Sequence, residues 1–170
     1  GGTTAKICLI DGGEPQQSRT FEVARQYRFM KGSGLPLRIP VIEMVEIGAG
    51  GGSIASVDTL SRIQVGPESA GSEPGPACYD RGGASATVTD ADAVLGRIDP
   101  DSFAAGTIPL NLEIGRNAIQ EVVGVPLDLS GLDAAFGISE IVEENMANAA
   151  RVHAVERGKE LGNRTMIAFG

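Results

Sequence analysis

Residues 46–58, EIGAGGGSIASVD, place a cluster of small residues between two segments that contain β-branched residues. The glycines are Gly48, Gly50, Gly51 and Gly52, and Ser53 follows them. Glycine lacks a Cβ, so such a run permits close backbone contacts or a positive φ. It is not a dinucleotide fingerprint, because G-x-G-x-x-G would need glycine at position 53. Two interpretations stay open: a tight turn between strands, or close approach of the backbone to a ligand or a neighbouring segment.

Strand and turn patterns surround this loop in the first half of the chain. An apolar run at 5–10 and an alternating run at 20–29 are expected to pair as a hairpin across the turn-rich residues 11–18. The alternation places Phe21, Val23, Tyr27 and Phe29 on one face, with Arg25 among them. Further expected elements are an apolar segment at 37–47 that Pro40 interrupts, a hairpin of 54–58 with 61–65, and a loop at 66–83.

Helical patterns follow in the second half. We expect a helix within 87–98, with Thr89 as N-cap and Asp92 three residues on, and a second at 110–124 that starts at Asn111 and stops at Gly124 and Pro126. A third helix begins after Ser130 and runs to about residue 160, and 164–169 form a final buried strand. The pattern predicts an α/β fold in which residues 1–170 form a single fragment, with strands and glycine loops in 1–85 and helices in 86–170.

Composition narrows the class of protein. The net charge is −8 and no Lys/Arg cluster occurs, which argues against a nucleic-acid partner. No run of about 18 apolar residues or signal peptide is visible, so we expect no membrane contact. The two cysteines form no disulfide framework, which favours a reducing cytoplasm. The chain starts without methionine and ends in an apolar run, so we expect a piece of a longer protein.

Few residues suggest chemistry by themselves. In GGTT, residues 1–4, backbone amides and threonine hydroxyls could donate to a phosphate, although the residues alone favour a hairpin turn. Asp90 could bind magnesium, act as a general base, or cap a helix. For Cys78 we favour a structural thiol over a nucleophile, because no histidine lies near it in sequence. His153 is expected to be a surface or packing residue, and no metal-ligand spacing occurs.

Three segments together resemble a known family: 46–58, then VGPESAGSEPGPACYDRGG at 65–83, then TVTDADAVLGRI at 87–98. They are similar to the hydantoinase/oxoprolinase family, and the resemblance covers essentially the whole chain. It implies an α/β fold that is part of an actin-like, ribonuclease H-like ATPase domain. It also implies ATP and Mg²⁺ as cofactors of the full-length protein.

The resemblance assigns roles to particular residues. Gly1, Gly2, Thr3 and Thr4 resemble a phosphate loop, and Gly170 lies at the start of an adenosine-side glycine motif. Gly48, Gly50, Gly51, Gly52, Ser53 and Asp90 are candidates for a loop that faces ligand or partner. The chain departs from the family pattern at Lys6, Ser56 and Asp80, where aspartate, tryptophan and glycine are common.

The implied activity is ATP-dependent hydrolysis of a cyclic amide, a hydantoin or a lactam like 5-oxoproline, with a hydantoinase B-type partner subunit or domain. The alternatives are an ATP-dependent carboxylase subunit of the acetone or acetophenone type, and a non-catalytic structural or subunit-contact module. The isolated fragment is expected to be inactive, and the resemblance names no catalytic residue.

Overall fold

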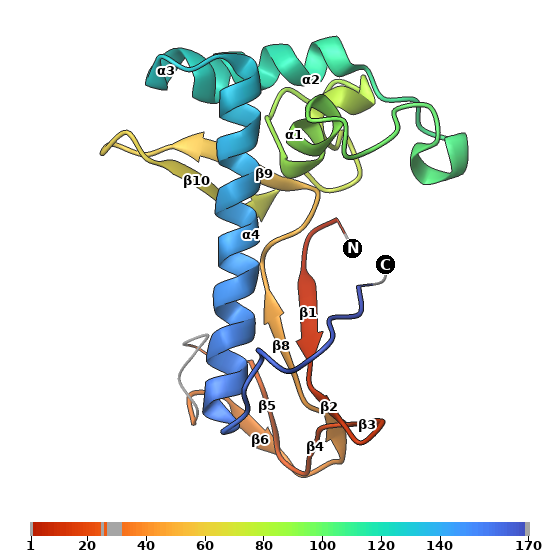
Figure 1. Ribbon diagram of the computed structural model, residues 1–170, viewed down its shortest axis with the longest axis vertical. Helices are drawn as coiled ribbons and strands as arrows, with labels where there is room; N and C mark the ends of the chain where they lie inside the picture. Colours follow the sequence, from red (N-terminus) through yellow and green to blue (C-terminus); the bar gives the residue numbers. More distant parts are fainter. Residues whose placement is uncertain (1, 25, 27–31, 169–170) are drawn as a thin grey trace.

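The computed structural model describes residues 2–24, 26 and 32–168. One long helix, α4 (Gly131–Glu156), runs along most of the length of the molecule (Figure 1). The remaining helices and the hairpin of β9 and β10 gather at one end of α4, and the strands of the N-terminal segment lie along its other half (Figure 1). We call these helices and the β9–β10 hairpin the helical head. Helix α4 therefore connects the helical head with the N-terminal strands.

The elements follow one another as strands first and helices second. The strands are β1 (Ala5–Cys8), β2 (Ile10–Asp11), β3 (Glu14–Pro15), β4 (Gln17–Ser18), β5 (Phe21–Val23), β6 (Leu35–Leu37), β7 (Val41–Ile42), β8 (Met44–Ile47), β9 (Ser53–Val57) and β10 (Ile63–Ser69). The helices before α4 are η1 (Ala77–Tyr79), α1 (Val88–Val94), η2 (Phe103–Gly106), α2 (Leu112–Ile119), η3 (Gln120–Gly124) and α3 (Val125–Leu127).

The N-terminal strands form one long antiparallel ribbon. Its paired segments are β1 with β8, β4 with β7 and β5 with β6. The expected pairing of 5–10 with 20–29 is therefore wrong: Ala5 faces Ile47 and Phe21 faces Leu37. The turn signal at 11–18 is real but local, because it closes only the short hairpin of β2 and β3. After this hairpin the chain continues through β4 to β5, and then runs back through β6, β7 and β8 as their antiparallel partners.

The two long runs of the ribbon are shorter than the alternation suggests. Within 20–29 only Phe21–Val23 forms a strand, and Ala24 has φ +52°, a value that ends regular extended backbone. Arg25, Tyr27 and Phe29 lie outside the described residues. The expected interruption at Pro40 is confirmed, because it falls between β6 and β7.

The helical head encloses the main core. The expected hairpin of 54–58 with 61–65 is confirmed as β9 and β10, in which Ile63 faces Val57. Its inner face packs with α1, α2 and α4 around fully buried side chains such as Ile119, Val123 and Ile138. These apolar residues recur at helical spacing on α2, η3 and α4, so burial of one face of each helix explains why they pack together.

Helix α1 begins two residues earlier than expected. Its N-cap is Thr87 rather than Thr89, and Asp90 rather than Asp92 completes the capping box. Both T-x-x-D frames are present in the sequence. The first one is selected because the amide of Thr89 is already used: it donates to the carbonyl oxygen of Gly51 at 2.8 Å.

The N-caps of the two later helices are as expected, and their ends are not. Asn111 caps α2 and Ser130 caps α4. Helical backbone continues past Gly124 and Pro126 to Leu127, because η3 is a π-helical turn and places the proline in the first turn of α3. Helix α4 ends at Glu156, followed by Gly158 at φ +62°. In the described part of the chain no single helix is long and apolar enough to cross a membrane; only the bent pair Leu112–Leu127 and Gly131–Glu156, which meet at 88°, reaches that measure together.

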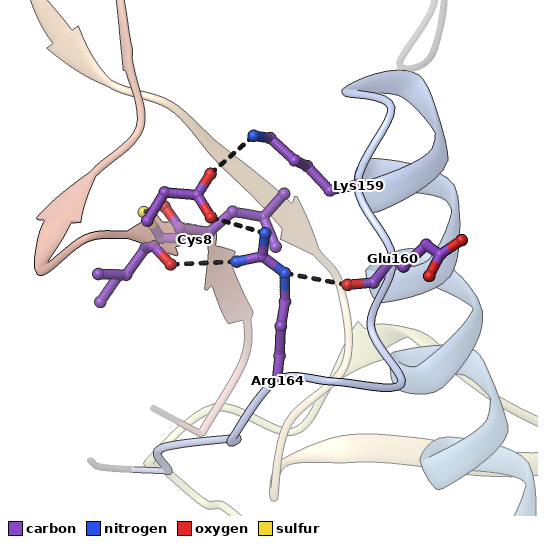
Figure 2. A network of polar contacts seen from close by, with 7 residues as sticks. Cys8, Lys159, Glu160 and Arg164 are labelled. Atoms are coloured by element: carbon purple, nitrogen blue, oxygen red, sulfur yellow. Dashed lines mark hydrogen bonds and ion pairs between the residues drawn. The ribbon is translucent and has the colours of Figure 1, made fainter.

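The stretch after α4 is tied to the ribbon by Arg164 (Figure 2). Its guanidinium donates to the carbonyl oxygens of Glu160 and Ile10, both at 3.0 Å, and to the Asp11 carboxylate at 2.6 Å. Lys159 lies 3.0 Å from the second oxygen of Asp11. The expected buried strand at 164–169 is wrong for the described residues 164–168, which pair with no strand and leave Met166 90% exposed.

Candidate functional site

The candidate site lies where the N-terminal segment meets the glycine loop. Gly2 and Thr3 are exposed and immediately precede β1. The carbonyl oxygen of Gly2 accepts a hydrogen bond from the amide of Gly52. The structure therefore brings together two candidates from the sequence, the phosphate-loop-like residues 2–4 and the loop 48–53. Gly1 and Gly170 lie outside the described residues.

The glycine loop is tightly organised by its own hydrogen bonds. The amide of Gly50 donates to the Ser53 hydroxyl at 3.0 Å, and the amide of Ser53 donates back to the carbonyl oxygen of Gly50 at 3.0 Å. Ser53 is fully buried. The positive-φ glycines of the described chain do not include Gly48, Gly50, Gly51 or Gly52, so a left-handed backbone is not the reason for these glycines.

Close approach to neighbouring segments explains two of them. A Cβ at Gly51 would lie 2.6 Å from Oγ1 of Thr89, at the start of α1. A Cβ at Gly52 would lie 2.8 Å from both the Gly2 carbonyl oxygen and the Ser69 hydroxyl. Separations below 3.0 Å are not tolerated without movement of the neighbour. The geometry supports both interpretations left open by the sequence: residues 50–53 form a tight turn between β8 and β9, and this turn lies close to neighbouring segments.

Ser69 at the end of β10 is a site residue that the sequence reasoning missed. Its hydroxyl lies 3.2 Å from the Thr3 hydroxyl, and it also accepts a hydrogen bond from the amide of Gly71 at 3.2 Å. A serine inside a Gly/Pro-rich loop carries no signal in a single sequence. The register of β10 shifts between Val65 and Ser69, and the Ser69 side chain lies beside the N-terminal segment.

Asp90 is buried and fully engaged by the protein. Its carboxylate accepts hydrogen bonds from the amides of Ala77, Cys78 and Thr87, the two shortest at 2.7 and 2.8 Å, and from the Thr87 hydroxyl at 2.7 Å. Four donors around one carboxylate leave little capacity for a ligand. Of the roles considered for Asp90, the geometry supports helix capping, and it adds the anchoring of η1 to α1.

Cys78 and His153 do not form a catalytic pair in the contacts described. Cys78 is fully buried in η1, and burial, followed by the charge of Asp90, raises the pKa of its thiol far above the ordinary value. A protonated buried thiol is a poor nucleophile. His153 is buried in the last turn of α4. Both cysteines are free thiols. Within the described residues, no group of three His, Cys, Asp or Glu side chains could hold a metal ion.

The three departures from the expected pattern have simple structural settings. Lys6 on β1 lies 3.8 Å from Glu46 on β8, a pair that is about half exposed on each side. Ser56 is exposed on β9. Asp80 has φ +55°, a left-handed conformation that glycine adopts without steric cost, and its carboxylate accepts a hydrogen bond from Asn111 at 3.3 Å.

The chain is an α/β unit with the fold class of the actin-like ATPases. The class predicted from the sequence is confirmed by similarity to two solved structures. Nucleotide-free acetone carboxylase superposes with a TM-score of 0.77 at 30% identity, over 94% of this chain and 21% of that one. The ATP-dependent caprolactamase of Pseudomonas jessenii gives a TM-score of 0.74 at 37% identity, over 92% of this chain and 21% of that one.

The chain belongs to the hydantoinase/oxoprolinase family, whose sequence profile matches residues 1–170. It is 45% identical over 135 residues to the acetophenone carboxylase gamma subunit of Aromatoleum aromaticum, covering 79% of this chain and 18% of that subunit. It is 38% identical over 170 residues to the caprolactamase subunit alpha of P. jessenii, covering 100% and 23% respectively. The chain thus spans about a fifth of the length of these relatives, both of which are named as subunits.

Proposed function

We propose that this chain is the part of an ATP-dependent enzyme that contributes a phosphate-binding segment, Gly1–Thr4, to the nucleotide site. The observation that carries the proposal is the seating of Gly2 on the glycine loop just before β1. A glycine-rich turn with adjacent threonine hydroxyls supplies uncharged donors for phosphate oxygens. The ATP-dependent caprolactamase and acetone carboxylase, both similar to this chain, support the choice of nucleotide.

The reaction that we propose for the whole protein is ATP-dependent opening of a cyclic amide, such as a hydantoin or a lactam like 5-oxoproline. Transfer of the terminal phosphoryl group of ATP to the amide oxygen releases ADP and makes the ring carbon electrophilic. Water then adds to this carbon and the C–N bond breaks, which leaves an acyl phosphate. A second water converts that group to carboxylate and phosphate. The similarity to the subunit alpha of caprolactamase, which covers all of this chain, favours this reaction.

Carboxylation of a ketone is the second candidate. Its support is the 45% identity to the acetophenone carboxylase gamma subunit. In that reaction ATP would activate an enol oxygen for carboxylation. A partner subunit of the hydantoinase B type fits either reaction, because both relatives are named as subunits of larger proteins.

The described part of this chain offers no set of side chains that could bind Mg²⁺. No cluster of three candidate side chains occurs there, and the carboxylate of Asp90 is taken up by four protein donors. No step is therefore assigned to a metal held by these residues. The contribution of this chain is to bind and orient phosphate through backbone and hydroxyl groups.

The test is a substrate panel with the whole protein and its partner subunit, supplied with Mg-ATP. Cyclic amides should release inorganic phosphate and yield the ring-opened acid. Ketones with labelled bicarbonate should yield labelled carboxylic acid if the carboxylase reaction is the right one. Absence of nucleotide turnover and of ATP binding in the complete assembly would refute the proposal.

A further inference from the structure

We propose that Ser69 and Gly52 are positioning residues, which fix the Gly2–Thr3 peptide and the Thr3 hydroxyl in the orientation that receives a phosphate oxygen. The inference rests on the proposed function, because it takes the nucleotide to bind at residues 1–4. It goes further by giving the glycine loop and the end of β10 a defined task. That task is to support the phosphate-binding segment from behind.

The first step concerns the direction of the Thr3 amide. The amide of Gly52 donates to the carbonyl oxygen of Gly2, so this carbonyl points at the glycine loop. The cis peptide bonds of the described chain are Gly66–Pro67 and Glu73–Pro74, so the Gly2–Thr3 bond is trans. In a trans peptide the C=O and the following N–H point in opposite directions. The N–H of exposed Thr3 is therefore directed away from the loop, where an anion can approach it.

The second step concerns the Thr3 hydroxyl. Ser69 accepts a hydrogen bond from the amide of Gly71 and lies 3.2 Å from the Thr3 hydroxyl. When Ser69 donates its proton to Thr3, the proton of Thr3 is left to point outward. A hydroxyl has one proton and two lone pairs, so it can accept from Ser69 and donate to a ligand at the same time. The amide and the hydroxyl of Thr3 are then both able to donate to a ligand.

The third step is that several polar groups of the loop are already bonded within the protein. The amides of Gly50, Gly52 and Ser53 donate to protein acceptors. The carbonyl oxygens of Gly51 and Gly52 accept from Thr89 and Ala70, each at 2.8 Å. The absence of a Cβ at Gly52 is needed because one would press on both the Gly2 carbonyl oxygen and the Ser69 hydroxyl. Gly52 is thus the point at which the loop supports residues 2–3.

The experiment compares ATP and adenosine binding by calorimetry in the whole protein. Ser69→Ala should weaken ATP binding about five- to tenfold, as expected for the loss of one oriented hydrogen bond, and should leave adenosine binding unchanged. Ser69→Thr, which keeps the hydroxyl, should recover most of the ATP affinity. Thr59→Ala, at an exposed position of the β9–β10 turn, is the control and should match the wild type.

Kinetics and stability separate positioning from folding. Ser69→Ala should raise KM for ATP more than it lowers kcat, with thermal unfolding close to that of the wild type. Gly52→Ala should act in the same direction, and Ser69→Ala keeps the proposal testable if Gly52→Ala fails to fold. Equal ATP affinity in wild type and Ser69→Ala would overturn the positioning role alone. Failure of the wild type to bind ATP would overturn the proposed function, and the positioning role with it.

Discussion

Gly51→Ala is the substitution whose cost is most directly fixed by the structure. The added Cβ would lie 2.6 Å from Oγ1 of Thr89 and 4.0 Å from its Cβ, so the conflict is with a single oxygen atom. Thr89 is 4% exposed, and its amide is bonded to the Gly51 carbonyl oxygen, which restricts how far either residue can move. Overpacking of this kind costs about 1–3 kcal/mol. We expect a loss of that size in the free energy of unfolding.

A double-mutant cycle measured by urea denaturation tests the cause. Thr89→Ala removes the conflicting oxygen, so it should offset most of the effect of Gly51→Ala. Thr89→Val keeps two atoms at the γ position and should not. Gly162→Ala is the control, because a Cβ there has no atom within 4 Å and φ is not positive. An unfolding free energy of Gly51→Ala equal to that of the wild type, or equal rescue by alanine and valine at position 89, would refute the reasoning.

Three further predictions concern single side chains. Asp90→Asn replaces an acceptor with a donor facing buried N–H groups, and should cost at least about 1–3 kcal/mol in chemical denaturation; a wild-type midpoint would contradict this. Cys78 should resist alkylation at pH 8 until the chain unfolds, because burial raises its thiol pKa; rapid labelling in native buffer, read by mass spectrometry, would be the opposite result. Hydrogen bonds from the Arg62 side chain and backbone lower the pKa of Asp58 to about 2, below its ordinary 3.8. The contribution of the Asp58 carboxylate to stability should be complete above about pH 4 and fall as the pH drops toward 2. A carboxyl NMR titration, with Asp58→Asn as reference, should show the lowered pKa, and an ordinary pKa would contradict the prediction.

Local signals in the sequence are sufficient for the starts of α2 and α4. The expected helix starts at Asn111 and after Ser130 are confirmed, because each is a polar residue suited to an N-cap ahead of an apolar periodic segment. Local sequence could not decide whether Thr87 or Thr89 is the N-cap of α1, because the outcome depends on the hydrogen bond between Thr89 and the distant Gly51. Tertiary contacts decided between two equal local patterns.

Strand pairing in the ribbon could not be predicted from local sequence signals. Its arms pair residues as far apart as Ala5 and Ile47, and nothing in the alternation of a strand says which partner it takes. The stretch 164–168 has the composition of a buried strand, yet it has no strand beside it in the described chain. A strand needs a partner for its backbone groups, so apolar composition alone does not make one.

Only part of the candidate site could be predicted from the sequence. The run of glycines at 48–52 signalled a close approach, but the partners Gly2, Ser69 and Thr89 lie up to about fifty residues away and only the fold brings them together. Positive φ is not the reason for glycine in this loop, and steric contact is a sufficient reason at Gly51 and Gly52.

A structure of the whole protein with a non-hydrolysable ATP analogue is the most direct test of the central claim. The account predicts a phosphate oxygen within about 3 Å of the Thr3 amide or hydroxyl. It also predicts that residues 48–53 and Ser69 lie behind this segment without touching the nucleotide. Phosphates bound directly on the glycine loop, or bound elsewhere with residues 2–4 away from them, would contradict it.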